Sequence, residues 1–188
     1  MPLTLAIDPG LDGLGAALFE DRELLQAWYS PGPPRAKLTS DLARDGSGYR
    51  ERGPRVWRAV ANSIAWLNDS PLTKPDRVVV ELMKVYGGRG GYGKDPGDLL
   101  ELSGVNGCVV ATFPDAEIGG VLARDWKGQV PKPIMLARIE TWLTARAWRD
   151  RVLTPKPAAL VHNAIDAAGL GMVAIGIEGR LRVPAFNR

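Results

Sequence analysis

Residues 77–83, RVVVELM, constrain the fold of this chain more than any other segment. They form a largely apolar run rich in β-branched side chains, which is typical of a strand covered on both faces of its sheet. A strand of this kind belongs in a sheet that has helices packed against it. Glu81 stands near the end of the run, where a buried acidic side chain is costly and therefore needs a reason.

The first thirty residues predict an antiparallel meander. Residues 3–8 alternate in side-chain type with the period of a strand, and Asp8 ends that strand on its small-residue face. An Asp-Gly pair at 12–13 between apolar segments is a hairpin signal. Residues 14–20 should therefore return antiparallel, and residues 23–29 should follow as a third strand.

The remaining segments alternate between helical and extended patterns, with loops at 30–53 and 87–97. Further elements are expected in this order: a helix at 54–68, the strand at 77–83, a helix at 99–113, a strand at 116–122, and helices at 131–148 and 157–177. This order predicts an α/β fold with a mixed five-stranded sheet, an antiparallel meander of three strands plus parallel strands, flanked by helices. No repeat or linker divides the chain, so we expect a single domain over 1–188.

Composition excludes several classes of protein. The chain is 45% apolar, which is enough to bury a core, and its single cysteine, Cys108, excludes a disulfide framework or a cysteine-based zinc site. No basic region precedes an apolar stretch at the N-terminus, and no window approaches the ~18 apolar residues of a membrane span. We therefore expect a soluble, cytoplasmic protein without a membrane partner.

Positive charge is concentrated in two stretches. Residues 35–58 hold seven basic against three acidic side chains, and residues 124–156 hold eight against three, within a net charge of +3. Either stretch alone is explained by a solvated surface. Because the two flank acidic residues at strand ends, they favour a nucleic-acid partner.

Three acidic residues stand where a core would place apolar ones: Asp8, Glu81, and Asp166 within the apolar segment AIDAAGLGMVAIG. Taken singly, each has a structural explanation: Asp8 shapes a turn, Glu81 forms an ion pair at the strand end, and Asp166 lies on a helix face that packs closely. If the last helix packs against the first strand, all three lie at one edge of the sheet and repel one another unless a divalent cation lies between them. Oxygen ligands favour Mg²⁺ or Mn²⁺, and two such ions can hydrolyse a phosphodiester without a covalent intermediate.

Four motifs occur in order along nearly the whole chain: IDPG at 7–10, the strand ending in Glu81, DWKGQVPK at 125–132 and HNAIDAAGLG at 162–171. This ordered set resembles the RuvC family of Holliday junction resolvases, in its phage-type branch. The resemblance implies an RNase H-like fold, a homodimer, and an endonuclease that makes paired symmetrical nicks in four-way and branched DNA. For a phage-encoded enzyme, the place of action is the host cell cytoplasm.

The resemblance also implies a set of metal ligands, with no small-molecule cofactor. Asp8, Glu81 and Asp166 match the family's acidic ligands, and a fourth ligand usually stands three residues before the last of them, where this chain has Asn163. His162, one residue earlier, shares a helix face with Asp166 and is predicted to act as the fourth ligand or as the base for the attacking water. We expect these four residues to be catalytic and to hold two Mg²⁺ or Mn²⁺ ions.

Six residues are predicted to contact DNA: Lys127 and Lys132 in the basic motif, and Tyr86, Arg89, Tyr92 and Lys94 in the glycine-rich loop after Glu81. In the family, the basic motif lies near the scissile phosphate, and the loop probes the junction. The alternatives are that the two lysines are simply solvated and that the loop is a simple connector. The six tryptophans are more simply core and interface residues than platforms for DNA bases, and Trp126, beside Lys127, is the first candidate for an exception. Four apolar residues at helical spacing are candidates for either a dimer contact or the core: Leu99, Leu102, Val105 and Val109.

Other functions fit parts of the pattern. An actin- or sugar-kinase-like ATP-binding protein also opens with a strand, an Asp-x-Gly turn and a hairpin, but needs a second lobe for which this chain is too short. A DNA-binding module without chemistry would not need all three acidic residues. An RNA–DNA hybrid nuclease and a loosely specific debranching enzyme are separated poorly from a resolvase by sequence.

Overall fold

The computed structural model describes residues 1–10, 13–31, 74–82, 96–127, 132–143 and 149–176. The strands are β1 (Leu3–Asp8), β2 (Gly13–Glu20), β3 (Glu23–Pro31), β4 (Arg77–Leu82) and β5 (Glu117–Leu122). The helices are α3 (Pro96–Thr112), α4 (Ala123–Trp126), α5 (Lys132–Trp142), the 3₁₀ helix η1 (Ala158–Leu160) and α7 (Val161–Ala174).

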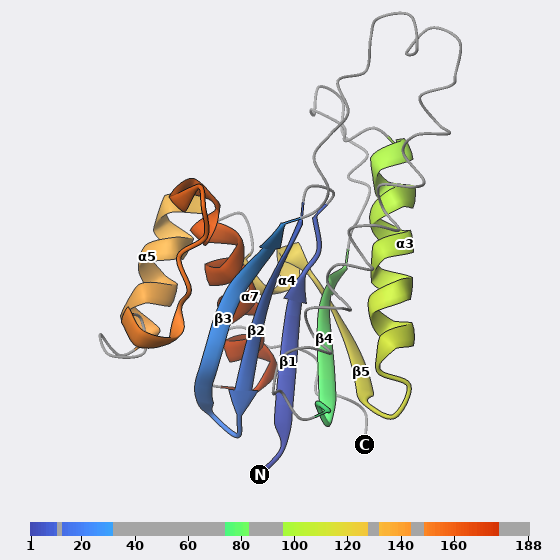
Figure 1. The fold of residues 1–188 in the computed structure, drawn as a ribbon, viewed down its shortest axis with the longest axis horizontal. Helices are drawn as coiled ribbons and strands as arrows, with labels where there is room; N and C mark the ends of the chain where they lie inside the picture. Colours follow the sequence, from blue (N-terminus) through green and yellow to red (C-terminus); the bar gives the residue numbers. More distant parts are fainter. Residues whose placement is uncertain (11–12, 32–73, 83–95, 128–131, 144–148, 177–188) are drawn as a thin grey trace, which may run out of the picture.

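The strands form one sheet in the order β3-β2-β1-β4-β5 (Figure 1). Strands β1, β2 and β3 pair antiparallel as a meander, whereas β4 pairs parallel to β1 and β5 pairs parallel to β4. The carboxyl ends of β1, β4 and β5 therefore lie at the same edge of the sheet. The predicted fold class, a mixed five-stranded sheet flanked by helices, is confirmed.

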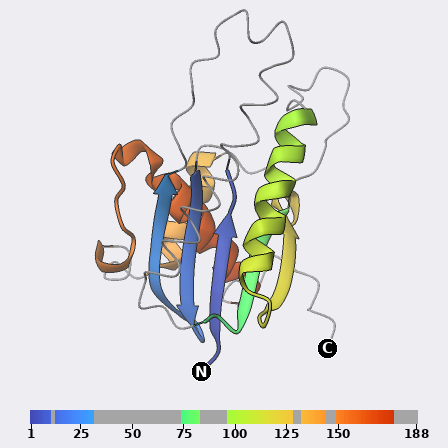
Figure 2. The same ribbon diagram turned by 45° about the vertical axis from the view of Figure 1, so that its right-hand side comes forward.

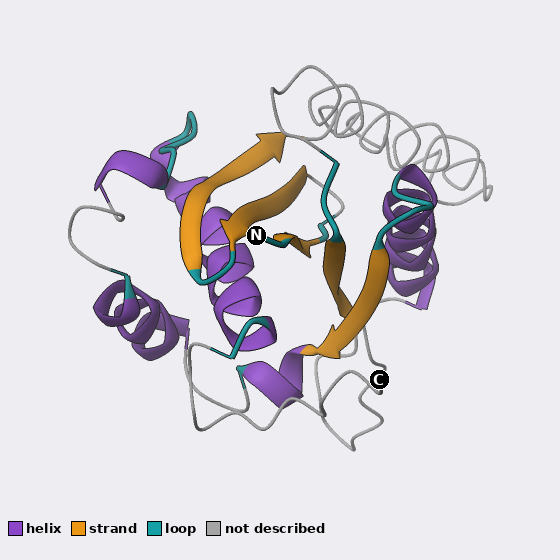
Figure 3. Ribbon diagram, turned by 90° about the horizontal axis from the view of Figure 1, so that it is seen from below, coloured by secondary structure: helices purple, strands orange, loops and turns teal. Residues whose placement is uncertain are grey.

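Helices cover both faces of the sheet, α7 on one and α3 on the other (Figures 2 and 3). Successive side chains of a strand alternate between the two faces. Ala6 of β1 and Val79 of β4 belong to the core on the α7 side. Two residues further along each strand, Asp8 and Glu81 therefore lie on that same face. This alternation is what directs both acidic side chains towards α7.

Helix α7 packs directly on the sheet because small residues allow a close approach. Residues 164–173 are all buried. Glycine inside a helix costs about 1 kcal/mol relative to alanine, so a glycine there needs a packing reason. A Cβ added at Gly171 would collide with the ring of Phe19, and one at Gly15 of β2 would collide with the carbonyl oxygen of Asn163. The first turn of α7 is thereby held beside the start of β2.

The predicted end of β3 and the predicted start of α3 are wrong. Strand β3 continues past residue 29 to Pro31, because Ser30 and Pro31 still pair with Leu14 and Gly13 of β2. Helix α3 begins at Pro96 rather than at 99. Proline is tolerated there because the N–H groups of the first helical turn have no partner within the helix.

The predicted helix over 131–148 is also wrong at its end. Helix α5 ends at Trp142, and the chain bends at Leu143, whose N–H still donates to the Ile139 carbonyl at 3.0 Å. The last predicted helix, 157–177, opens as η1 and ends at Ala174. Helix α4 was not predicted, because four residues are too few to show a helical period.

Three of the four candidates for a dimer contact belong to the core of the chain itself. Leu102, Val105 and Val109 on α3 are 4%, 2% and 2% exposed, so core packing explains their spacing. The side chain of Leu99 lies outside what is described. Cys108, on the same helix, is partly buried against the same core.

Residues 32–73 and 83–95 lie outside the described segments. They include the predicted helix at 54–68 and most of both predicted loops. Within the segments that are described, no helix has the length and apolar character to cross a bilayer. The single domain over 1–188 stays a prediction.

Candidate active site

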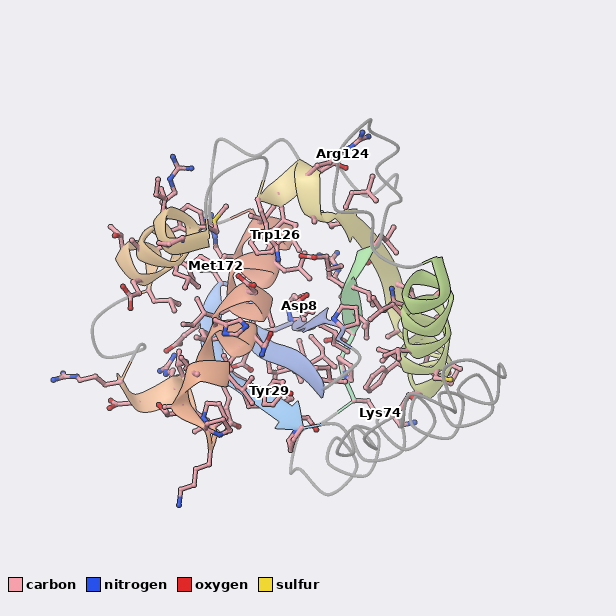
Figure 4. All side chains as sticks on the ribbon, turned by 90° about the horizontal axis from the view of Figure 1, so that it is seen from above. Asp8, Tyr29, Lys74, Arg124, Trp126 and Met172 are labelled. Atoms are coloured by element: carbon pink, nitrogen blue, oxygen red, sulfur yellow. The ribbon has the colours of Figure 1, made fainter. Side chains whose placement is uncertain are left out.

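Three acidic residues from three elements lie at the carboxyl edge of the parallel strands. Asp8 is the last residue of β1, Glu81 is the penultimate residue of β4, and Asp166 lies in the second turn of α7. The parallel register pairs Ile7 with Val80. The next residues, Asp8 and Glu81, are therefore neighbours across the strands, with Cα atoms about 5 Å apart. Figure 4 looks down on this edge, with Asp8 at the end of β1.

The ammonium group of Lys127, which directly follows α4, lies among these carboxylates. Its Nζ is 2.9 Å from Glu81 Oε2 and 3.5 Å from Asp166 Oδ2. The side chains of Glu81 and Asp166 are only 7% and 10% exposed, so water does little to solvate their charges. Asp8 acts on the same ammonium electrostatically. Lys127 is thus a counter-charge shared by all three acidic residues.

These surroundings set the pKa of Lys127. Burial favours the neutral amine and lowers the pKa, but the charges of Asp8, Glu81 and Asp166 and a hydrogen bond to Glu81 outweigh it. The net effect raises the pKa above its ordinary value of 10.5. Lys127 is therefore positively charged throughout the neutral range.

Trp126, the last residue of α4, also reaches this cluster. Its Nε1–H donates to Glu81 Oε2 at 2.7 Å, and the Lys127 ammonium lies 4.6 Å from the centre of its ring. The side chain is fully buried, so Trp126 is a core residue and not an exception that stacks on a DNA base. The sequence pointed to this residue through its place beside Lys127, but it contained no sign that the indole bonds to Glu81.

The described hydrogen bonds of the His162 and Asn163 side chains are with carbonyl oxygens of the preceding turn. Nδ1 of His162 is 2.7 Å from the Ala159 carbonyl oxygen, and Nδ2 of Asn163 donates to the Leu160 carbonyl at 3.2 Å. A carbonyl oxygen only accepts, so Nδ1 is the donor in this contact. His162 is partly exposed one turn before Asp166, and its role as ligand or base stays a prediction.

The carboxylates do not form a ready coordination shell. In the segments that the structure describes, no three Asp, Glu, His or Cys side chains are arranged so that they could hold a metal ion. The donor chemistry nevertheless fits a divalent cation. Three formal negative charges face the single positive charge of Lys127, and carboxylate oxygens are the ligands that Mg²⁺ and Mn²⁺ prefer. Asp8, Glu81 and Asp166 are the residues suited to hold such an ion.

The predicted DNA contacts are mostly outside the description. Tyr86, Arg89, Tyr92 and Lys94 lie in residues 83–95, and of Lys132 only the backbone, at the start of α5, is described. Lys127 is described, with its ammonium on the carboxylates and 23% of its side chain exposed. The DNA contacts of all six residues stay predictions.

The fold of the chain has counterparts among solved structures. No protein-family model and no curated protein matches the chain. Among solved structures, it is similar to T. thermophilus RuvC in complex with a Holliday junction substrate, with a TM-score of 0.54 and 17% identity over 93% of this chain and 94% of that one. Another structure of Thermus thermophilus RuvC matches with a TM-score of 0.46 and 15% identity over 93% and 95% of the two chains. The chain therefore has the RNase H-like fold of RuvC.

Proposed function

We propose that the chain is a metal-dependent endodeoxyribonuclease that resolves Holliday junctions and other branched DNA by paired symmetrical nicks. The observation that carries the proposal is the convergence of Asp8, Glu81 and Asp166 on one ammonium group at the edge of an RNase H-like sheet. One supporting fact is that the similar T. thermophilus protein was solved with a Holliday junction substrate.

Electrostatics favour a divalent cation at this edge. Among the side chains in contact here within the described segments, three carboxylates against one ammonium have a formal charge of −2, and the low exposure of Glu81 and Asp166 weakens the screening of that charge by water. Two Mg²⁺ or Mn²⁺ ions, when bound, would polarise the scissile phosphate and lower the pKa of the attacking water. Asp8, Glu81 and Asp166 would hold and orient these ions.

Two other side chains have roles that follow from their protons. Because Nδ1 of His162 faces the Ala159 carbonyl, Nε2 is the nitrogen that would accept the proton of the attacking water or bind a metal ion, one helical turn before Asp166. Lys127 carries a positive charge at the carboxylates and contacts the phosphate as the DNA backbone approaches. The charge of Lys127 would keep the substrate phosphate close to the three acidic residues.

Paired nicks need two active sites, so the proposed enzyme acts as a homodimer on four-way DNA. The glycine-rich loop after Glu81 and the basic stretches are the proposed contacts with the junction arms. This assignment depends on sequence, because most of these residues lie outside the described segments.

The decisive experiment compares three substrates with the same protein. A four-way junction, a linear duplex of matched sequence and an RNA–DNA hybrid are incubated with and without Mg²⁺ or Mn²⁺. We expect paired symmetrical nicks only in the junction and only with metal. Cleavage of the hybrid alone would instead identify an RNase H-type enzyme, and cleavage of all branched forms at scattered positions would identify a debranching nuclease.

Asp8→Asn tests the site itself. It keeps the shape of the side chain and removes one negative charge, so nicking should fall by at least a hundredfold while gel-shift binding to the junction survives. Asp115→Asn is the matched control, because that acidic side chain is 80% exposed and paired only with Lys74 among the described residues. Normal nicking by Asp8→Asn in Mg²⁺ would refute the proposed function.

A further inference from the structure

Trp126 is the largest side chain that is fully buried in the described part of the chain. An indole has one N–H donor, and a buried donor needs an acceptor. Backbone carbonyls are the common acceptors, yet this N–H donates to a charged carboxylate, Glu81 Oε2, at 2.7 Å. The bond joins α4 to β4 at the candidate active site.

The ring of Trp126 is held rigidly. A Cβ added at Gly169 of α7 would lie 2.9 Å from Trp126 Cζ3 and 2.5 Å from Ile139 Cδ1, so the indole fills a space that only a glycine leaves open. On another side, the Lys127 ammonium lies 4.6 Å from the ring centre, within cation–π range. Three elements, α4, α5 and α7, thus fix where the N–H is aimed.

The two groups that bond to Glu81 differ in stiffness. Both use the same oxygen, Oε2, which accepts from the indole and from the Lys127 ammonium. Lysine has a flexible four-carbon stem, and its ammonium is shared with Asp166 and Asp8. Trp126 has a rigid ring with a single donor, so the indole is the contact that defines the orientation of the carboxylate.

We propose that Trp126 is a positioning residue that fixes the Glu81 carboxylate in the orientation that metal binding requires. The inference rests on the proposed function, since it assigns Glu81 to a metal ion. Partners that hydrogen-bond to metal ligands typically change metal affinity by 10–100-fold when they are removed. Trp126 itself touches neither metal nor substrate.

The test measures metal binding without DNA, by calorimetric titration of the whole chain with Mn²⁺. Trp126→Phe keeps an aromatic ring and removes the N–H. Trp142→Phe removes the same atoms from a tryptophan that is partly buried against the same core and is the matched control. We expect Mn²⁺ affinity to fall about tenfold in Trp126→Phe and to stay unchanged in Trp142→Phe. Melting temperatures of both variants show whether the difference follows from lost packing.

The outcomes separate the inference from the function on which it rests. If wild-type protein binds Mn²⁺ and Trp126→Phe binds it equally well, the positioning role is refuted and the proposed nuclease stands. If wild-type protein binds no Mn²⁺, the proposed metal chemistry fails and the inference fails with it. Equal weakening in both tryptophan variants would also refute the positioning role, because lost packing would then explain the effect.

A second measurement does not require Trp126→Phe to fold. In ¹H–¹⁵N spectra, the indole signal that shifts most in Glu81→Gln belongs to the bonded tryptophan, because that substitution removes the charge of the acceptor. The same signal should shift when Mg²⁺ is added to wild-type protein. An indole signal that responds to Glu81→Gln and ignores saturating Mg²⁺ would overturn the proposal.

Discussion

At the residue scale, Lys127 determines whether three neighbouring carboxylates can coexist in the folded chain. Its ammonium is within 3.5 Å of oxygens from two of them and acts electrostatically on the third. A salt bridge on a protein surface contributes little to stability, but these acidic side chains are largely buried. Removing their counter-charge would leave negative charges facing one another.

Lys127→Met tests this role. The substitution keeps an unbranched, flexible side chain that is one atom shorter and removes the charge, so the free energy of unfolding should fall by about 1–3 kcal/mol without metal. Mg²⁺ should restore part of the loss, because it replaces the missing positive charge. Urea denaturation with and without Mg²⁺ measures both effects. Arg124→Met is the control: that side chain is half exposed and pairs with Asp125, so a change below about 0.5 kcal/mol is expected.

The raised pKa of Lys127 gives the pH dependence of the same effect. A group whose pKa is higher in the folded chain than in the unfolded chain stabilises the folded chain. This stabilisation is fully present below the unfolded pKa and is lost as the pH rises through the folded pKa. The difference in unfolding free energy between wild type and Lys127→Met should therefore be constant from pH 7 to pH 9. It should narrow only above about pH 10.5, the ordinary value for lysine. Narrowing already at pH 8 would show that the ammonium is not stabilised by the carboxylates.

At the scale of elements, the contact between α7 and β2 places Asp166 beside the strands that carry the other two acidic residues. Gly15 pairs with Asp8 across the meander and also faces the carbonyl of Asn163 on α7. A side chain at this position would push the first turn of the helix away from the sheet. Backbone spacing therefore controls the geometry of the candidate site.

Gly15→Ala should destabilise the chain by about 1–3 kcal/mol, because its Cβ meets backbone atoms that cannot turn aside. Gly107→Ala on α3 is the opposite case: nothing lies within 4 Å of the added Cβ, and alanine favours a helix. That variant should gain about 0.5–1 kcal/mol. Thermal unfolding of both proteins measures the contrast. Equal effects of the two substitutions would contradict the close approach of α7.

The elements also show what a sequence reveals and what it hides. Strands β1, β4 and β5 could be predicted because their side-chain patterns are set locally, and Asp8 and Glu81 were recognisable as acidic residues at strand ends. Helix α4 is too short to have a period. The bond from Trp126 to Glu81 joins residues 45 positions apart, and it forms only when the tertiary fold brings α4 to β4. Contacts of this kind depend on tertiary structure and leave no local pattern.

At the scale of the whole molecule, two cores share one sheet. The core on the α7 side contains Trp126, and the core on the α3 side contains Trp28 of β3. Strands β1, β2, β3 and β4 each contribute side chains to both cores, so the loss of one core would expose the other face of the same strands. This arrangement favours folding as one cooperative unit, as expected for a single domain over 1–188.

The two tryptophans report on the two cores separately. In protein labelled with fluorotryptophan, the ¹⁹F signals of Trp28 and Trp126, each assigned by its loss in a Trp→Phe variant, can be followed through a urea titration. Both signals should disappear at the same midpoint, and Gly15→Ala should lower both midpoints equally, although it disturbs only the contact with α7. A Trp28 signal that persists after the Trp126 signal is lost would mean that the α3 side of the sheet folds on its own. The candidate site would then lie on a layer that opens separately from the rest of the chain.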